Sequence, residues 1–117
     1  MAGDQVTRLK LMIDSTLDDG RFVVINDSRV DAPVGTTFVE MTVRAGELVA
    51  GEFKSEQIGS ATVLELRLDS VESWHRSLDA VPFGHNAAIQ LSGAGLRKLR
   101  DLLARKSKGQ YVFLASA

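Results

Sequence analysis

The amino-acid sequence predicts a single, mostly β domain that folds as a small closed antiparallel β-barrel with one amphipathic helix near the C-terminus. Its length of 117 residues suits one domain. Short apolar runs, several with period-two alternation, are separated by turn residues, as is typical of antiparallel strands. A stripe of leucines with helical spacing lies near the C-terminus. We therefore expect a barrel over residues 6–117 and a flexible N-terminus at residues 1–5.

The first third of the chain predicts two strands joined by a tight turn. Val6–Ile13 is expected to be a strand, although its apolar residues would equally fit a helical stripe. Asp18–Gly20 predicts a turn, because Asp-Gly tolerates the positive φ of a tight reversal. The β-branched run Phe22–Ile25 predicts a buried strand, and Asn26–Gly35 predicts a loop.

The middle of the chain predicts a hairpin followed by a further strand. Thr37–Arg44 alternates with period two over eight residues, which predicts a strand. We expect a turn at Gly46 and a second arm over Glu47–Phe53. Val63–Asp69 carries leucines at every second position, which predicts a half-buried strand with a polar outer face.

The C-terminal part predicts a strand, the helix and a closing strand. The pattern loosens over Trp74–Phe83, and Ala88–Leu91 then predicts a short strand. The leucines of the segment Leu96–Leu103 recur on one face of a 3.6-residue helix. Gly109 is expected to end the helical segment, and Tyr111–Ala115 to close the chain with a strand.

Composition excludes several classes of function. The chain has no cysteine, which excludes disulfides, thiol catalysis and cysteine-ligated metal sites. Its longest apolar runs are far shorter than the roughly 20 residues that a membrane helix needs. The N-terminus lacks the basic and apolar regions of a secretory signal. We therefore expect a cytoplasmic protein that does not associate with membranes.

Charge is distributed unevenly along the chain. The segment 97–108 carries a net charge of +5, which leaves −6 for the other 105 residues. Its basic residues are Arg97, Lys98, Arg100, Arg105, Lys106 and Lys108. They could bind the phosphates of a nucleic acid or an acidic protein face. Alternatively, they form a solvated outer face, with cations gathered where the helix dipole favours them.

A second candidate surface combines aromatic, histidine and charged residues. Its central residues are Glu72, Trp74, His75 and Arg76, with Phe83 and His85 further along the chain. The two histidines and their acidic neighbours could form a metal site or an acid–base pair. However, the spacing of a structural metal site and a nucleophile-elbow motif are both missing. A Trp-His-Arg run on a barrel loop more often reflects packing plus a solvated edge, and the functional alternative is a partner-binding rim. We expect a protein that is not an enzyme and holds no cofactor or metal.

Three stretches between Phe22 and Ala117 carry a resemblance to a known family. The first comprises Gly35-Thr36, the strand to Val43 and Gly46-Glu47-Leu48-Val49-Ala50-Gly51. The second runs from Val71-Glu72 through Leu78-Asp79 to Gly84-His85-Asn86 and on to Gly93. The third is the helical segment followed by Gly109-Gln110 and an apolar strand. Together they resemble the second-domain β-barrel of translation GTPases such as elongation factor Tu.

The resemblance implies a binding role. In members that bind aminoacyl-tRNA, the barrel offers a Glu and an Arg to the aminoacylated 3′ end. Glu72 matches that Glu, whereas His75 occupies the Arg position and Arg76 follows it. The phosphate-binding G-x-x-x-x-G-K-[ST] loop is missing, so we expect no GTP to be bound by this chain. We expect a non-enzymatic module that contacts RNA or the ribosome through its basic helix. The alternative is a protein-interaction or homo-oligomerisation domain without a nucleic-acid role.

Overall fold

A computed structural model describes residues 8–117, with only the backbone described at 47–49 and 52–55. The expected flexible N-terminus at residues 1–5 lies outside this part of the chain. The elements, in chain order, are β1 (Lys10–Thr16), β2 (Phe22–Asn26), β3 (Ala32–Pro33), β4 (Thr37–Val49), β5 (Glu52–Ser73), β6 (Arg76–Leu78), β7 (Ala80–Val81), β8 (Asn86–Ser92), α1 (Leu96–Arg105) and β9 (Gln110–Ser116).

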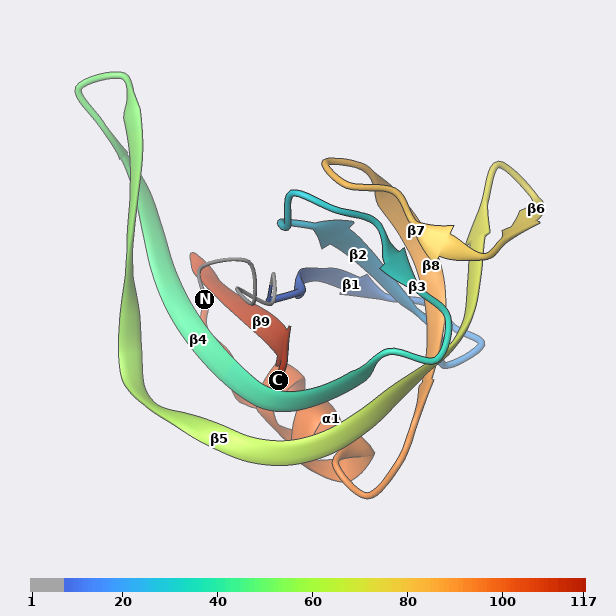
Figure 1. The fold of residues 1–117 in the computed structure, drawn as a ribbon. Coiled ribbons are helices and arrows are strands. Elements are labelled where there is room, and N and C mark those ends of the chain that lie inside the picture. Colours follow the sequence, from blue (N-terminus) through green and yellow to red (C-terminus); the bar gives the residue numbers. More distant parts are fainter. Residues whose placement is uncertain (1–7) are drawn as a thin grey trace, which may run out of the picture.

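The main sheet returns to its own starting strand (Figure 1). Its order is β4-β9-β1-β2-β8-β5-β6, and β4 also pairs with β5. Six strands therefore form a ring of backbone hydrogen bonds, and every pairing in it is antiparallel. β6 pairs with the last three residues of β5, and β3 pairs with β7 in a separate small sheet. The prediction of a mostly β fold with one helix is confirmed.

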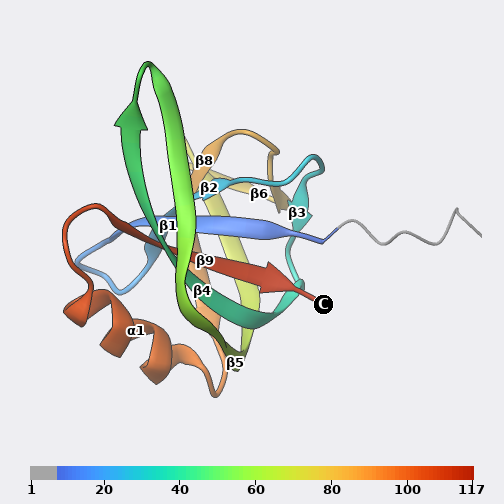
Figure 2. The ribbon, with the colours of Figure 1, turned by 90° about the vertical axis from the view of Figure 1, so that its left-hand side faces the viewer.

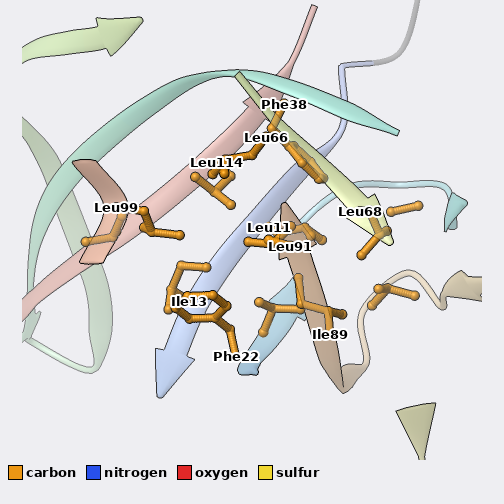
Figure 3. Packing of buried hydrophobic residues seen from close by; sticks show 14 of the residues in the cluster. Leu11, Ile13, Phe22, Phe38, Leu66, Leu68, Ile89, Leu91, Leu99 and Leu114 are labelled. Carbon is orange, nitrogen blue, oxygen red and sulfur yellow. The ribbon is translucent and has the colours of Figure 1, made fainter. Parts of the chain in front are cut away.

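The core lies on one face of each strand of the ring (Figure 3). Leu11 and Ile13 of β1, Phe22 and Val24 of β2 and Ile89 of β8 are buried at alternate positions. This spacing follows from the side-chain period of two in a strand. Full burial of such a side chain stabilises a fold by about 1.5–3 kcal/mol. The apolar alternation in the sequence thus becomes the main source of stability.

The structure decides the ambiguity at the N-terminal strand. β1 pairs with both β2 and β9 from Lys10 onwards, so the helical alternative for this segment is wrong.

The turn expected at Asp18–Gly20 is confirmed, with Gly20 at a φ of +90° and its N–H donating to the Leu17 carbonyl. The expected strand at Phe22–Ile25 is confirmed as β2. The expected strand at Ala88–Leu91 lies within β8, and that at Tyr111–Ala115 within β9.

The expected turn at Gly46 is wrong. Gly46 is paired with Ser55 inside an uninterrupted ribbon of β4 and β5, and the reversal occurs at Ala50 and Gly51. These two residues have φ of 51° and 83°, the positive values that a two-residue hairpin turn requires at both positions. The expected second arm, Glu47–Phe53, therefore spans the turn. Figures 1 and 2 show this ribbon protruding beyond the ring.

β5 is far longer than the expected strand at Val63–Asp69. Its 22 residues pair first with β4 and later with β8 and β6. The pairing with β4 shifts register around Gly59, whose φ is +69°. Such irregularities bend a strand, which allows one strand to serve both the ribbon and the ring. The buried leucines Leu64, Leu66 and Leu68 confirm the expected half-buried pattern.

The helix α1 covers part of the core with its leucine face. Leu99 is fully buried, and Leu96, Leu102 and Leu103 pack against the core cluster, which confirms the amphipathic helix. The loop before it lies on β5, where the Gly95 N–H donates to the Glu65 carbonyl at 2.9 Å. Within residues 8–117, no helix is long and apolar enough to cross a membrane.

Candidate functional site

The outer face of α1 and the residues after it form the basic helix surface. Arg97, Lys98, Arg100 and Arg105 are exposed on the helix, whereas Lys106 is half-buried beyond its end and Lys108 is exposed. The leucine face points inward, so the side chains with positive charge point to solvent. The structure thus brings together all six basic residues that the sequence singled out.

The contacts of this surface leave its charge uncompensated. Lys98 Nζ donates to the Val63 carbonyl at 3.3 Å, and Lys106 Nζ donates to the Gln110 carbonyl at 3.3 Å. Arg105 Nε donates to the Asp101 carbonyl at 3.2 Å within the helix. All these acceptors are neutral, and in the described part of the chain no ion pair involves a basic residue of this surface. Its positive potential therefore remains available to an anionic partner.

Arg100 makes two contacts with other elements, which the described structure does not show for Arg97 and Arg105 of the same helix. Its Nη2 donates to the Gly20 carbonyl at 2.9 Å, and its guanidinium carbon lies 4.9 Å from the centre of the buried Phe22 ring. The second geometry is a cation–π interaction. Arg100 thus fastens α1 to the β1–β2 turn, so a substitution there would disturb the fold as well as the charge.

The second candidate surface is built around the tip of the β5–β6 hairpin. Ser73 pairs with Arg76, so Trp74 and His75 are the two turn residues. Their φ values are 52° and 61°, the left-handed conformation that a two-residue hairpin turn requires. Glycine and asparagine are the usual residues there, because other side chains are strained at positive φ. Trp74 is 92% exposed.

Two open depressions lie beside Trp74. One has a volume of about 570 Å³ and is lined by Trp74, Arg76, Leu78, Pro82 and His85 among others. The other has a volume of about 420 Å³ and lies on the side of Glu72 and Arg21. We call the exposed tip and these depressions the Trp74 rim.

The geometry does not assemble an acid–base pair from the histidines. Glu72 Oε1 is 3.3 Å from Arg21 Nη1, so its partner is that guanidinium and not His75. In the described part of the chain, no hydrogen bond joins His85 to Asp79. Nor do three or more histidine or acidic side chains meet there in an arrangement that could hold a metal ion.

Arg21 is a residue that the sequence analysis missed. It binds Glu72 on one side and Asp19 on the other, with 2.8 Å between Arg21 Nε and Asp19 Oδ2. Its neighbour Gly20 accepts the hydrogen bond from Arg100. The β1–β2 turn therefore lies between the basic helix surface and the Trp74 rim. Nothing in the sequence pairs Arg21 with Glu72, because 51 positions separate them.

We expect the pKa of the Asp19 carboxyl to depend on its hydrogen bonds with Arg21 in this turn. Its pKa is lowered by the hydrogen bond from the Arg21 backbone N–H and then by that from the Arg21 side chain. A depressed pKa contributes stability above the unfolded-state pKa of about 3.9, and this contribution is lost as the pH falls through the folded-state pKa. Arg21→Gln should therefore raise the pKa of Asp19, as measured by an NMR titration of its carboxyl carbon. Arg29→Gln is the control. An unchanged Asp19 titration in Arg21→Gln would contradict this assignment.

A groove on another part of the sheet was also missed. It has a volume of about 560 Å³, and its lining includes the apolar side chains of Met12, Ile25 and Phe113. Arg8 and Glu40 line its wall and form an ion pair at 3.0 Å. Its residues come from five strands, β1, β2, β4, β5 and β9, and from the segments next to them, so no local motif could have indicated it.

Compared with known protein families, curated proteins and solved structures, the chain matches none. The resemblance to the translation-GTPase barrel therefore stays a prediction.

Proposed function

We propose that this chain is a non-enzymatic RNA-binding module that contacts RNA or the ribosome through its basic helix surface. In this proposal the ring of strands is a small closed barrel of the translation-protein type, similar to the second domain of elongation factor Tu-type GTPases. The module acts in the cytoplasm, binds no GTP itself and needs no cofactor. The single observation that carries the proposal is the uncompensated cluster of six basic residues on and after α1, five of which are exposed.

The physical mechanism is charge presented on a rigid support. The buried Leu99 and the contacts of Arg100 hold α1 in a fixed position on the sheet. The side chains of Arg97, Arg105 and Lys108 are exposed, and in the described part of the chain they form no hydrogen bond or ion pair with another element. Binding of phosphates to such side chains releases condensed counterions, so the affinity falls as salt concentration rises. Aromatic residues do not occur within α1, so backbone phosphates and not bases are the expected contacts.

The test measures RNA affinity at several salt concentrations. A fluorescent ribosomal RNA fragment and total tRNA serve as probes, with binding followed by anisotropy. The variant Arg97→Glu/Arg105→Glu/Lys108→Glu should bind far more weakly, and the slope of log K against log salt should decrease by about three, one for each phosphate contact. Arg100 is left intact, because its substitution would loosen the helix from the Phe22 ring.

The matched control is Lys10→Glu/Arg29→Glu/Arg67→Glu, which makes the same change in net charge away from α1. It should retain most of the wild-type affinity. Equal losses in the two variants would mean that overall charge and not this surface is responsible. An absence of binding by the wild-type protein at low salt would overturn the proposal.

A further inference from the structure

The tip of the β5–β6 hairpin has a sequence that folding does not favour. A two-residue turn with positive φ at both positions is best satisfied by Asn-Gly, whereas this chain places Trp74 and His75 there. Strained backbone of this kind persists where the surrounding structure enforces it, and it is enriched at sites of function. The fold therefore presents an indole at a position where a smaller residue would be more stable.

Little of the apolar surface of Trp74 is buried within the chain. It is the single tryptophan of the sequence and is 92% exposed. Phe83, on the loop before β8, is 58% exposed. Tryptophan is the residue type most enriched among the energetic anchors of protein interfaces. An exposed aromatic side chain at the hairpin tip and a second one next in sequence to Pro82, which lines the larger depression, point to a surface that becomes covered.

The Trp74 rim holds a projecting side chain and a hollow next to each other. The depression of about 570 Å³ begins at Trp74 itself and continues to Leu78 and Pro82. Its volume lies within the range of about 300–1,000 Å³ for pockets that bury a small ligand, so it has room for an indole. In a two-fold dimer the same patch meets itself. If a residue of the first copy contacts a second residue of the other copy, the same contact occurs with the copies exchanged. A knob beside a hollow is the arrangement that such a contact requires.

The charge of the rim agrees with a second copy as the occupant. The residues that line the two depressions carry three charges, those of Arg21, Glu72 and Arg76, and Arg21 compensates Glu72. Arg76 thus leaves one positive charge on the patch, and Asp79 follows it three residues along the chain, so two copies can meet with little repulsion between like charges. A polyanion, in contrast, would find little attraction here. We propose that the Trp74 rim is a homodimer interface, in which the Trp74 indole of each copy enters the depression beside Arg76, Leu78 and Pro82 of the other.

This interface is independent of the proposed RNA binding, and its test uses the protein alone. Sedimentation equilibrium of the full chain should give a mass that rises with concentration from 12.7 kDa towards twice that value. Fluorescence reports on the contact directly, because Trp74 is the single tryptophan. Its emission should shift to shorter wavelength, and its quenching by acrylamide should decrease, over the same concentration range.

The decisive variant is Trp74→Asn/His75→Gly. It should remain monomeric at every concentration, while its thermal unfolding midpoint stays equal to or above that of the wild type, because Asn-Gly suits the turn. Loss of association would therefore not be a loss of folding. Phe83→Ser should weaken association as well. Val63→Ser, which removes another exposed apolar side chain (76% exposed) far along β5, should leave it unchanged.

Four results would overturn the proposal. The wild type could stay monomeric with a fully quenchable indole at the highest concentration reached, or Trp74→Asn/His75→Gly could associate as the wild type does. A mass that grows beyond two copies would indicate a head-to-tail contact in place of a two-fold one. Quenching of Trp74 emission by single-stranded RNA, with no self-association, would assign the rim to RNA. The variant Arg97→Glu/Arg105→Glu/Lys108→Glu should dimerise normally, so the dimer and RNA binding fail or succeed separately.

Discussion

Gly93→Ala is expected to lower the free energy of unfolding by about 2–5 kcal/mol, because it combines backbone strain with a steric overlap. Gly93 has a φ of +128°, and a Cβ atom there would lie 2.7 Å from the Glu65 carbonyl oxygen. That oxygen belongs to the backbone of β5 and also accepts the Gly95 N–H, so it cannot move aside easily. Urea denaturation should show a lower midpoint with an unchanged slope.

The same substitution should also affect the basic helix surface. The Leu96 N–H donates to the Gly93 carbonyl at 3.2 Å, so a displaced loop would displace the start of α1. We therefore expect a lower RNA affinity in this variant even under conditions where it remains folded. The measurement is the anisotropy titration with the ribosomal RNA fragment.

Gly109→Ala is the matched control for Gly93→Ala. Gly109 also has a positive φ, of +85°, but no atom lies within 4 Å of an added Cβ. Gly109→Ala should therefore lower the free energy of unfolding only by the cost of placing a residue with a Cβ atom at positive φ, about 1–2 kcal/mol. If both variants lose the same stability, the close approach of Gly93 to β5 has no energetic importance.

Asn26→Ala is expected to destabilise the fold by about 2–4 kcal/mol, because it leaves the buried Val81 carbonyl and two partly buried backbone groups without these hydrogen bonds. Asn26 is only 1% exposed. Its Nδ2 donates to the Val30 carbonyl at 3.0 Å and to the Val81 carbonyl at 2.9 Å. Its Oδ1 accepts the Ser28 N–H at 2.9 Å. One amide thus ties the end of β2 to β7 and to the loop between β2 and β3.

Asn86→Ala provides the comparison. Asn86 is the other asparagine of the chain and is exposed at the start of β8, so its replacement should change stability by no more than about 0.5 kcal/mol. Thermal unfolding of the two variants measures the difference. A similar small effect at Asn26 would show that water can replace its three hydrogen bonds.

Elements with a complete local pattern were predicted well from the sequence. β2 and the leucine-bearing part of β5 alternate with period two, and the stripe in α1 follows the helical period. In each, the periodicity reflects one face turned to the core, so a short window of sequence carries the whole signal. The six basic residues around α1 were found for the same reason, because they occupy the complementary face.

Elements that depend on distant pairing were not predicted. The turn was expected at Gly46, since glycine favours turns, but β5 pairs along β4 well beyond it and the reversal falls at Ala50–Gly51. Asn26 was assigned to a loop, because its partner on β7, Val81, lies 55 positions away. The alternation in β4 is also interrupted, so that Phe38 and Met41, three positions apart, are both buried. A register shift between Phe38 and Glu40 accounts for this spacing.

The sequence by itself determined the class of fold, the faces of most strands and the charged helix, since each depends on residues that are neighbours along the chain. The tertiary structure alone decided which surfaces these residues form. It placed Arg21 between Asp19 and Glu72, set Arg100 on the Phe22 ring and held Trp74 outward beside a hollow. Of these contacts, that of Arg21 with Glu72 joins residues 51 positions apart, and that of Arg100 with Phe22 joins α1 to β2. The physical reason is that such contacts depend on pairing between strands that are distant in sequence. Pairing of this kind leaves no periodic pattern in the sequence.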